Sequence, residues 1–90
     1  MAGGDVRVTF LYFAWVRQKI GRSEEALSLP SHVRTVADAM AFLRAKGPAY
    51  AEAFREPAAL RAAVNEKHAS FDAAIHAGDE IAFFPPMTGG

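Results

Sequence analysis

The chain has 90 residues, which is the size of one small domain. Its ten basic and ten acidic side chains cancel, so charge gives no reason to expect binding to nucleic acid or to an anionic membrane. Cysteine is absent, which excludes disulfides, thiolate-held metal centres and a cysteine nucleophile and is consistent with a cytoplasmic protein. No apolar run approaches the roughly eighteen residues of a membrane span.

The first third of the chain predicts two strands joined by a short helix. Residues 5–13 are rich in β-branched and aromatic side chains that alternate between two faces, as in a strand. Residues 15–20 favour a short helical turn that ends at Gly21. Residues 24–29 favour a second strand. We expect residues 1–4 to form a flexible leader.

The middle of the chain predicts the main helix. Thr35 can cap its first turn, and Asp38 stands three residues later, as in a capping box. An apolar stripe at helical spacing follows, formed by Val36, Met40 and Leu43. Gly47-Pro48 ends this helix, and residues 49–55 favour a second, short one.

The last third predicts three strand segments. Residues 60–64 favour a strand, and residues 65–67 favour a hairpin turn into residues 68–69. Gly78-Asp79 is a turn signal before a final strand over residues 80–84. Alternation turns two side chains of this strand inward, Ile81 and Phe83, and two outward, Ala82 and Phe84. The order of elements predicts a small α+β domain with one helix packed across a mixed sheet.

No set of side chains forms a recognisable active site. His32, His68 and His76 stand in separate segments without the spacing of metal ligands, so we expect no metal site. Ser70 and Asp72 are close in sequence but suit a turn better than catalysis. We therefore expect a chain that is not catalytic alone.

The end of the chain is its most informative segment. Residues 83–88 carry no charged side chain and lead to Gly89-Gly90. We expect Gly90 to be the natural C-terminus and to carry the free carboxylate. A Gly-Gly tip has no Cβ atoms and can enter a narrow tunnel, and Pro85-Pro86 restricts the segment before it. We expect residues 1–84 to form the domain and residues 85–90 to protrude as a tail.

Two aromatic side chains predict a docking surface. Phe13 and Phe84 fall on the face opposite the core residues of their strands. Apolar side chains on an exposed sheet face indicate a binding patch. The alternative is that the short helices cover these two rings.

Three blocks of the chain resemble the small, sulfur-carrying subunit of molybdopterin synthase, a ubiquitin-like β-grasp family. The blocks are Leu11–Arg17, Ala62–Asn65 and Gly78–Gly90, the last reading GDEIAFFPPMTGG. The resemblance covers nearly the whole chain after residue 4 and implies the β-grasp fold. It also implies that Gly90 and Gly89 are the reactive tip.

The resemblance implies a cycle of chemistry at the tip and no bound cofactor. An ATP-dependent activating enzyme forms a glycyl adenylate, and a sulfur donor converts it to a thiocarboxylate. The tail then enters the large, catalytic synthase subunit, in a heterotetramer, and gives its sulfur to a pterin precursor for molybdenum cofactor biosynthesis. The residues implied to meet the partner are Phe13, His68, Phe84, Pro85, Pro86, Met87 and Thr88.

Three other interpretations remain open from the sequence. The same tip could join to lysines of other proteins, as in a ubiquitin-like modifier. The sulfur could serve another pathway, such as thiamine synthesis or tRNA thiolation. The fold could also act as an interaction domain with an inert tail.

Overall fold

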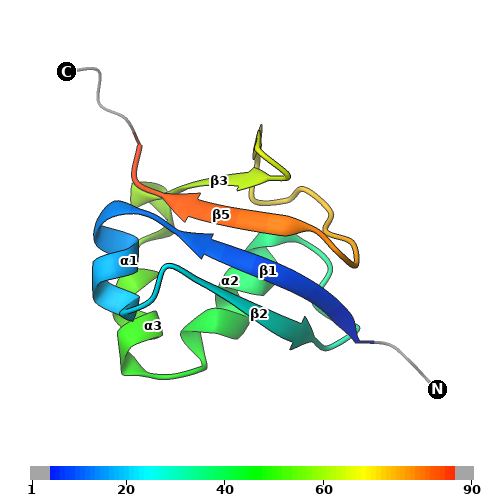
Figure 1. Ribbon diagram of the computed structural model, residues 1–90, viewed down its shortest axis with the longest axis horizontal. Helices are drawn as coiled ribbons and strands as arrows, with labels where there is room; N and C mark the ends of the chain where they lie inside the picture. The colour runs from blue at the N-terminus through cyan, green and yellow to red at the C-terminus, as the bar shows by residue number, and fades with distance from the viewer. Residues whose placement is uncertain (1–4, 87–90) are drawn as a thin grey trace.

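The computed structural model describes residues 5–86, so the expectations for residues 1–4 and 87–90 lie outside the described part. The elements follow one another along the chain as the sequence predicts (Figure 1). In chain order they are β1 (Val6–Tyr12), α1 (Ala14–Ile20), β2 (Glu24–Leu29), α2 (Val36–Arg44), α3 (Pro48–Ala53), a 3₁₀ turn η1 (Pro57–Ala59), β3 (Arg61–Val64), β4 (Lys67–Ala69) and β5 (Glu80–Phe84).

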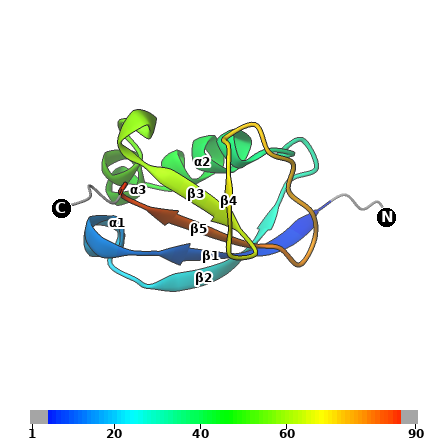
Figure 2. The same cartoon turned by 90° about the horizontal axis from the view of Figure 1, so that it is seen from above.

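The strands of residues 5–86 form one mixed sheet in the order β2-β1-β5-β3-β4. β1 and β5 run parallel, and the other neighbouring pairs run antiparallel. Helices α2 and α3 cover one face, and α1 packs at the end of the sheet (Figures 1 and 2). This is the β-grasp arrangement, so the expected fold class is confirmed.

Alternation in the two central strands builds the core. In β5, Ile81 and Phe83 are buried under the helices, whereas Ala82 and Phe84 face outward and are only partly covered. Phe83 packs edge-on against Phe54, with 5.1 Å between ring centroids, and stacks against Phe10 at 6.2 Å. The core therefore fixes β5 from its inner face and leaves its outer face free.

Local signals set the ends of the elements. The backbone N–H of Asp38 donates to the Thr35 hydroxyl at 3.1 Å, and the N–H of Thr35 donates to the Asp38 carboxylate at 3.2 Å, which confirms the capping box. Gly21 ends α1 with a φ of 92°, as expected for a glycine C-cap.

Several boundaries differ by one or two residues from the sequence predictions. The first strand ends at Tyr12 because Phe13 is already the N-cap of α1. Helix α3 starts at Pro48, which is favourable at the first helical position, and ends before Phe54. The hairpin turn has two residues, Asn65 and Glu66, whose φ values of 52° and 72° suit a tight turn, so Lys67 already belongs to β4.

A buried carboxylate joins the sheet to α3. The Glu25 side chain is 7% exposed and accepts hydrogen bonds from Tyr12 at 2.8 Å and Tyr50 at 2.7 Å. Arg22 donates to its other oxygen at 3.0 Å. Burial, then the bond to Glu25, raises the pKa of Tyr50 to about 12 and raises the pKa of Tyr12 further.

We expect this cluster to make the fold sensitive to alkali. Because the folded-state pKa values of Tyr12 and Tyr50 lie above the unfolded value of 10.0, their stabilising effect is complete below pH 10 and is lost as the pH rises toward 12. Urea unfolding from pH 8 upward should show this loss, and Tyr50→Phe should reduce it. A tyrosinate absorbance midpoint at pH 10 in the folded protein would contradict this account.

Candidate functional site

The chain leaves the sheet from its central strand, β5. β5 is paired with β1 on one side and with β3 on the other, up to Phe83 and Phe84. The N–H of Phe13 donates to the carbonyl of Phe83 at 3.2 Å. Pro85 has no N–H and cannot extend the ladder, so the chain leaves the sheet there (Figure 1). The tail therefore starts from a backbone that is held on both sides.

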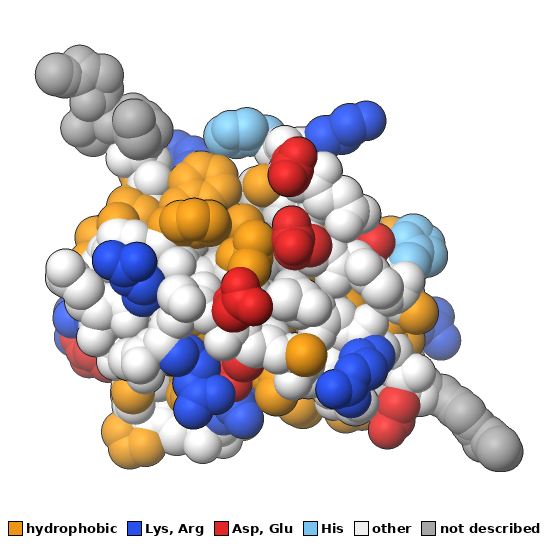
Figure 3. Space-filling model, in the orientation of Figure 1, with side chains coloured by type: hydrophobic (Ala, Val, Ile, Leu, Met, Phe, Trp, Pro, Cys, Tyr) orange, Lys and Arg blue, Asp and Glu red, His pale blue; other side chains and the backbone are white. Residues whose placement is uncertain are grey.

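An apolar patch lies beside this exit on the outer face of the sheet. We define the apolar patch as Leu11, Phe13, Ala82 and Phe84. Leu11 and Ala82 are partners in the register of β1 and β5. Phe13 follows Tyr12, the partner of Phe83, so it lies at the same end of the sheet as Phe84. Figure 3 shows hydrophobic side chains gathered at this place.

The exposure of Phe13 is unusual for its size. It is 47% exposed and is the large hydrophobic residue left open among residues 5–86. The short helices therefore do not cover it, contrary to the alternative considered from the sequence. An aromatic ring left in water beside a second, partly covered ring is typical of a surface that binds another protein.

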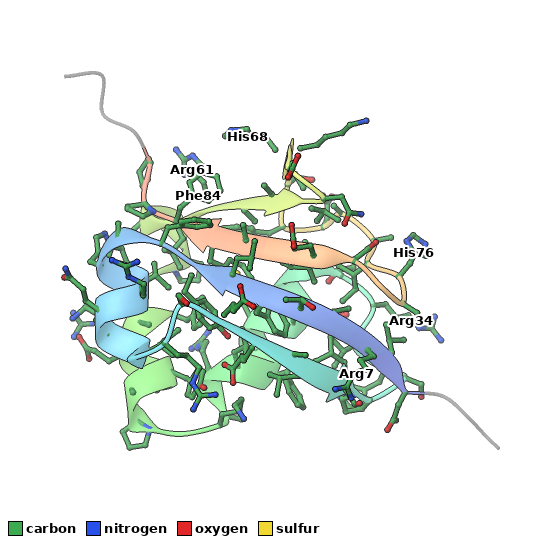
Figure 4. All side chains as sticks on the ribbon, in the orientation of Figure 1. Arg7, Arg34, Arg61, His68, His76 and Phe84 are labelled. Atoms are coloured by element: carbon green, nitrogen blue, oxygen red, sulfur yellow. The ribbon has the colours of Figure 1, made fainter. Side chains whose placement is uncertain are left out.

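Two cationic or polar side chains border the patch. The rings of His68 and Phe84 meet edge to face, with 5.5 Å between centroids and an angle of 88°. Arg61 is the register partner of Phe84 on β3. Figure 4 shows Arg61, His68 and Phe84 grouped at the end of the sheet from which the tail leaves. Arg61 is not recognisable as a site residue from the sequence, because its position depends on the β3–β5 register, which one sequence does not reveal.

The other proposed tail residues divide at Pro86. Pro85 and Pro86 follow β5 directly and are half-buried. Met87, Thr88, Gly89 and Gly90 lie outside the described residues. The structure therefore describes the base of the tail and the patch beside it.

The other candidate side chains from the sequence lie apart from the apolar patch or in exposed turns. Within residues 5–86 no group of His, Asp and Glu could hold a metal ion. Ser70 donates a hydrogen bond to Asp72 two residues away in an exposed turn, as its sequence suggested. His32 and His76 are exposed and stand apart from His68. In the same range no helix has both the length and the apolar character needed to cross a membrane.

The fold defines a ubiquitin-like β-grasp protein whose central strand β5 leads directly into Pro85 and Pro86. Residues 10–90 match the ThiS family. The chain is 39% identical over 83 residues to the molybdopterin synthase sulfur carrier subunit of Escherichia coli, covering 92% of this chain and 99% of that protein. The chain therefore belongs to the ThiS family.

Solved structures agree with this assignment. A Pyrococcus furiosus protein assigned as molybdopterin converting factor, subunit 1, is 31% identical with a TM-score of 0.74, over 91% of this chain and 99% of that one. SAMP1 of Haloferax volcanii, a small archaeal modifier protein, is 25% identical with a TM-score of 0.72, over 93% and 99% of the two chains.

The exposure of Phe13 predicts that this ring contributes little to stability. Phe13→Ser removes a half-open ring and places a favourable residue at the N-cap of α1, so we expect the free energy of unfolding to change by less than about 1 kcal/mol. Phe83→Ala, in the core, should lower it by about 3–5 kcal/mol. Urea unfolding of both variants measures the difference. A loss at Phe13 as large as that at Phe83 would show that Phe13 is a core residue.

Proposed function

We propose that this chain is the sulfur carrier subunit of a molybdopterin synthase. The observation that carries the proposal is its 39% identity to the Escherichia coli subunit of that name over nearly the whole of both chains. The described structure supports it with a firmly held tail base beside an exposed apolar patch. In this role the protein supplies the sulfur, and its partners supply the catalytic groups.

The reactive group is proposed to be the carboxylate of Gly90. A carboxylate is a poor electrophile, so it first reacts with ATP to form an acyl adenylate and release pyrophosphate. A sulfur donor then displaces AMP and leaves a thiocarboxylate. Gly89 and Gly90 have no side chains, so they crowd the reacting carbonyl of Gly90 less than any other residues would. The chain also has no cysteine that could accept the sulfur instead. No cofactor needs to be bound for these steps.

The large, catalytic subunit is proposed to receive the tail. Phe13 and Phe84 would anchor the docked domain, while Pro85 to Thr88 line the entry to the partner's active site and Gly89-Gly90 reach the pterin precursor. Pro85 and Pro86 reduce the freedom that the tail loses on insertion, which lowers the cost of binding. The paired base of β5 keeps the direction of entry fixed.

A sulfur atom on Gly90 is the first expected outcome. The purified chain is incubated with ATP, the activating enzyme of its host and a sulfur donor, and its intact mass and C-terminal fragments are measured. We expect one oxygen of Gly90 to be replaced by sulfur. A chain extended by one residue past Gly90 should fold equally well and show no such exchange at Gly90. Equal exchange and sulfur transfer by the extended chain would contradict the assignment of the tip.

Loss of the Phe84 ring should weaken binding of the large subunit. The ring is outward and partly exposed, so its removal leaves the core intact. We expect Phe84→Ala to reduce binding by about 2 kcal/mol or more, as for an aromatic hot spot. Isothermal titration calorimetry with the large subunit measures this, with Phe71→Ala, a partly buried ring outside the patch, as control. Unchanged affinity for Phe84→Ala would remove this residue from the docking surface.

A second function, as a protein modifier, is favoured by the likeness to SAMP1 at 25% identity. Activation of Gly90 would be the same, but the product would be an isopeptide to a lysine of another protein. Conjugate ladders on an immunoblot of host cells, lost when Gly89-Gly90 is deleted, would support it.

A further inference from the structure

One arginine stands beside the apolar patch and has no acidic partner among the described residues. Arg61 is exposed and lies opposite Phe84 in the sheet register. Its guanidinium donates to the backbone carbonyl of Leu60 at 3.0 Å. Among residues 5–86 no Asp or Glu oxygen lies within salt-bridge distance of it. Within residues 5–86 the remaining N–H groups of this guanidinium have no side-chain acceptor, so they can donate to another molecule.

Several basic side chains elsewhere on the domain are already engaged. Arg22 bonds to Glu25 at 3.0 Å, and Lys46 lies 5.4 Å from the Tyr50 ring centroid. Lys19 and Arg55 both approach Glu52, at 3.6 and 3.7 Å. Among residues 5–86 the Arg61 guanidinium has no such ion pair, and it lies beside the apolar patch.

His68 extends this polar border onto β4. Its ring lies edge-on to Phe84, and its neighbour Lys67 is exposed on the same strand. β3 and β4 are paired, so Arg61 and His68 lie on neighbouring strands, and Glu66 lies in the turn that joins these strands. We call Arg61 and His68 the basic border of the apolar patch.

We propose that the protein surface docking on the apolar patch carries acidic side chains opposite Arg61, and that the basic border selects this partner. The inference rests on the proposed function, which makes that partner the large synthase subunit. An apolar partner surface over Arg61 would bury the guanidinium charge without hydrogen-bond acceptors. The desolvation free energy would then exceed what a few apolar contacts contribute. A carboxylate there forms a planar, two-pronged pair with the guanidinium.

The charge of Arg61 would make binding at the apolar patch specific, because the patch itself offers only apolar contacts. Two aromatic rings would fit many hydrophobic hollows, including those of unrelated proteins. A charge that must be matched next to Phe84 rejects apolar and basic surfaces and speeds the encounter with an acidic one. Arg61 is therefore a residue that selects the partner and touches neither ATP nor the pterin.

The test measures association of the full chain with its large subunit at several salt concentrations. Three variants keep, remove or reverse the positive charge at this position: Arg61→Lys, Arg61→Gln and Arg61→Glu. We expect Arg61→Glu to weaken binding at least about tenfold at low salt, Arg61→Gln to weaken it less, and Arg61→Lys to keep most of it. The salt dependence should shrink when the charge is removed.

Arg7→Glu is the matched control, because Arg7 is an exposed arginine on the outer face of β1, at the opposite end of the sheet (Figure 4). It should bind within about twofold of the unmodified chain. A thermal melt checks that each variant is folded. All substituted positions are exposed, so we expect the fold to be kept.

The outcomes separate this inference from the proposed function. If the unmodified chain binds and Arg61→Glu binds equally well, or Arg7→Glu loses as much affinity, the basic border is not selective and the inference is overturned. If the unmodified chain neither binds the large subunit nor acquires sulfur on Gly90, the proposed function fails and this inference with it. Graded loss across the Arg61 series, with Arg7→Glu unaffected, supports it.

Discussion

The pairing of β5 with a neighbour on each side is the constraint on which the rest of the structure depends. β5 is short, yet it joins the β1–β2 half of the sheet to the β3–β4 half. Its inner side chains, Ile81 and Phe83, are fully covered by the core. The strand therefore connects both halves, fills the centre of the core and sets the place where the chain leaves the sheet at Pro85. Without this pairing, β1, which carries part of the apolar patch, would not be joined to β3 and β4, which carry the basic border.

Alternation in the same strand separates core residues from outward-facing residues. Phe83, which stabilises the domain, is followed directly by Phe84, which faces outward beside Arg61 and His68. A shift of register by one residue would exchange these roles. Hydrogen bonds from Tyr12 and Tyr50 to Glu25 hold α3 against the sheet. They thereby also help to keep Phe54, which follows α3, in the core.

Local signals in the sequence predicted most of the fold, because they act over a few residues. The Thr35–Asp38 capping box, the glycine after α1 and the alternation in residues 80–84 each appear as expected. What depends on pairing between distant segments was not predictable: the opposition of Arg61 to Phe84 and the meeting of Tyr12 and Tyr50 on Glu25. The tip itself was inferred from composition and resemblance, and the described residues end before it.

The position of β5 at the end of the chain order also bears on synthesis and quality control. Every other strand leaves the ribosome before residues 80–84, so the sheet cannot close until the segment that holds the tail has been made. An unfinished chain would keep facing edges of β1 and β3 unpaired and open to aggregation or proteolysis. Completion of the sheet is thus coupled to synthesis of its last strand, and a chain that lacks residues 80–84 would expose open strand edges in place of the apolar patch.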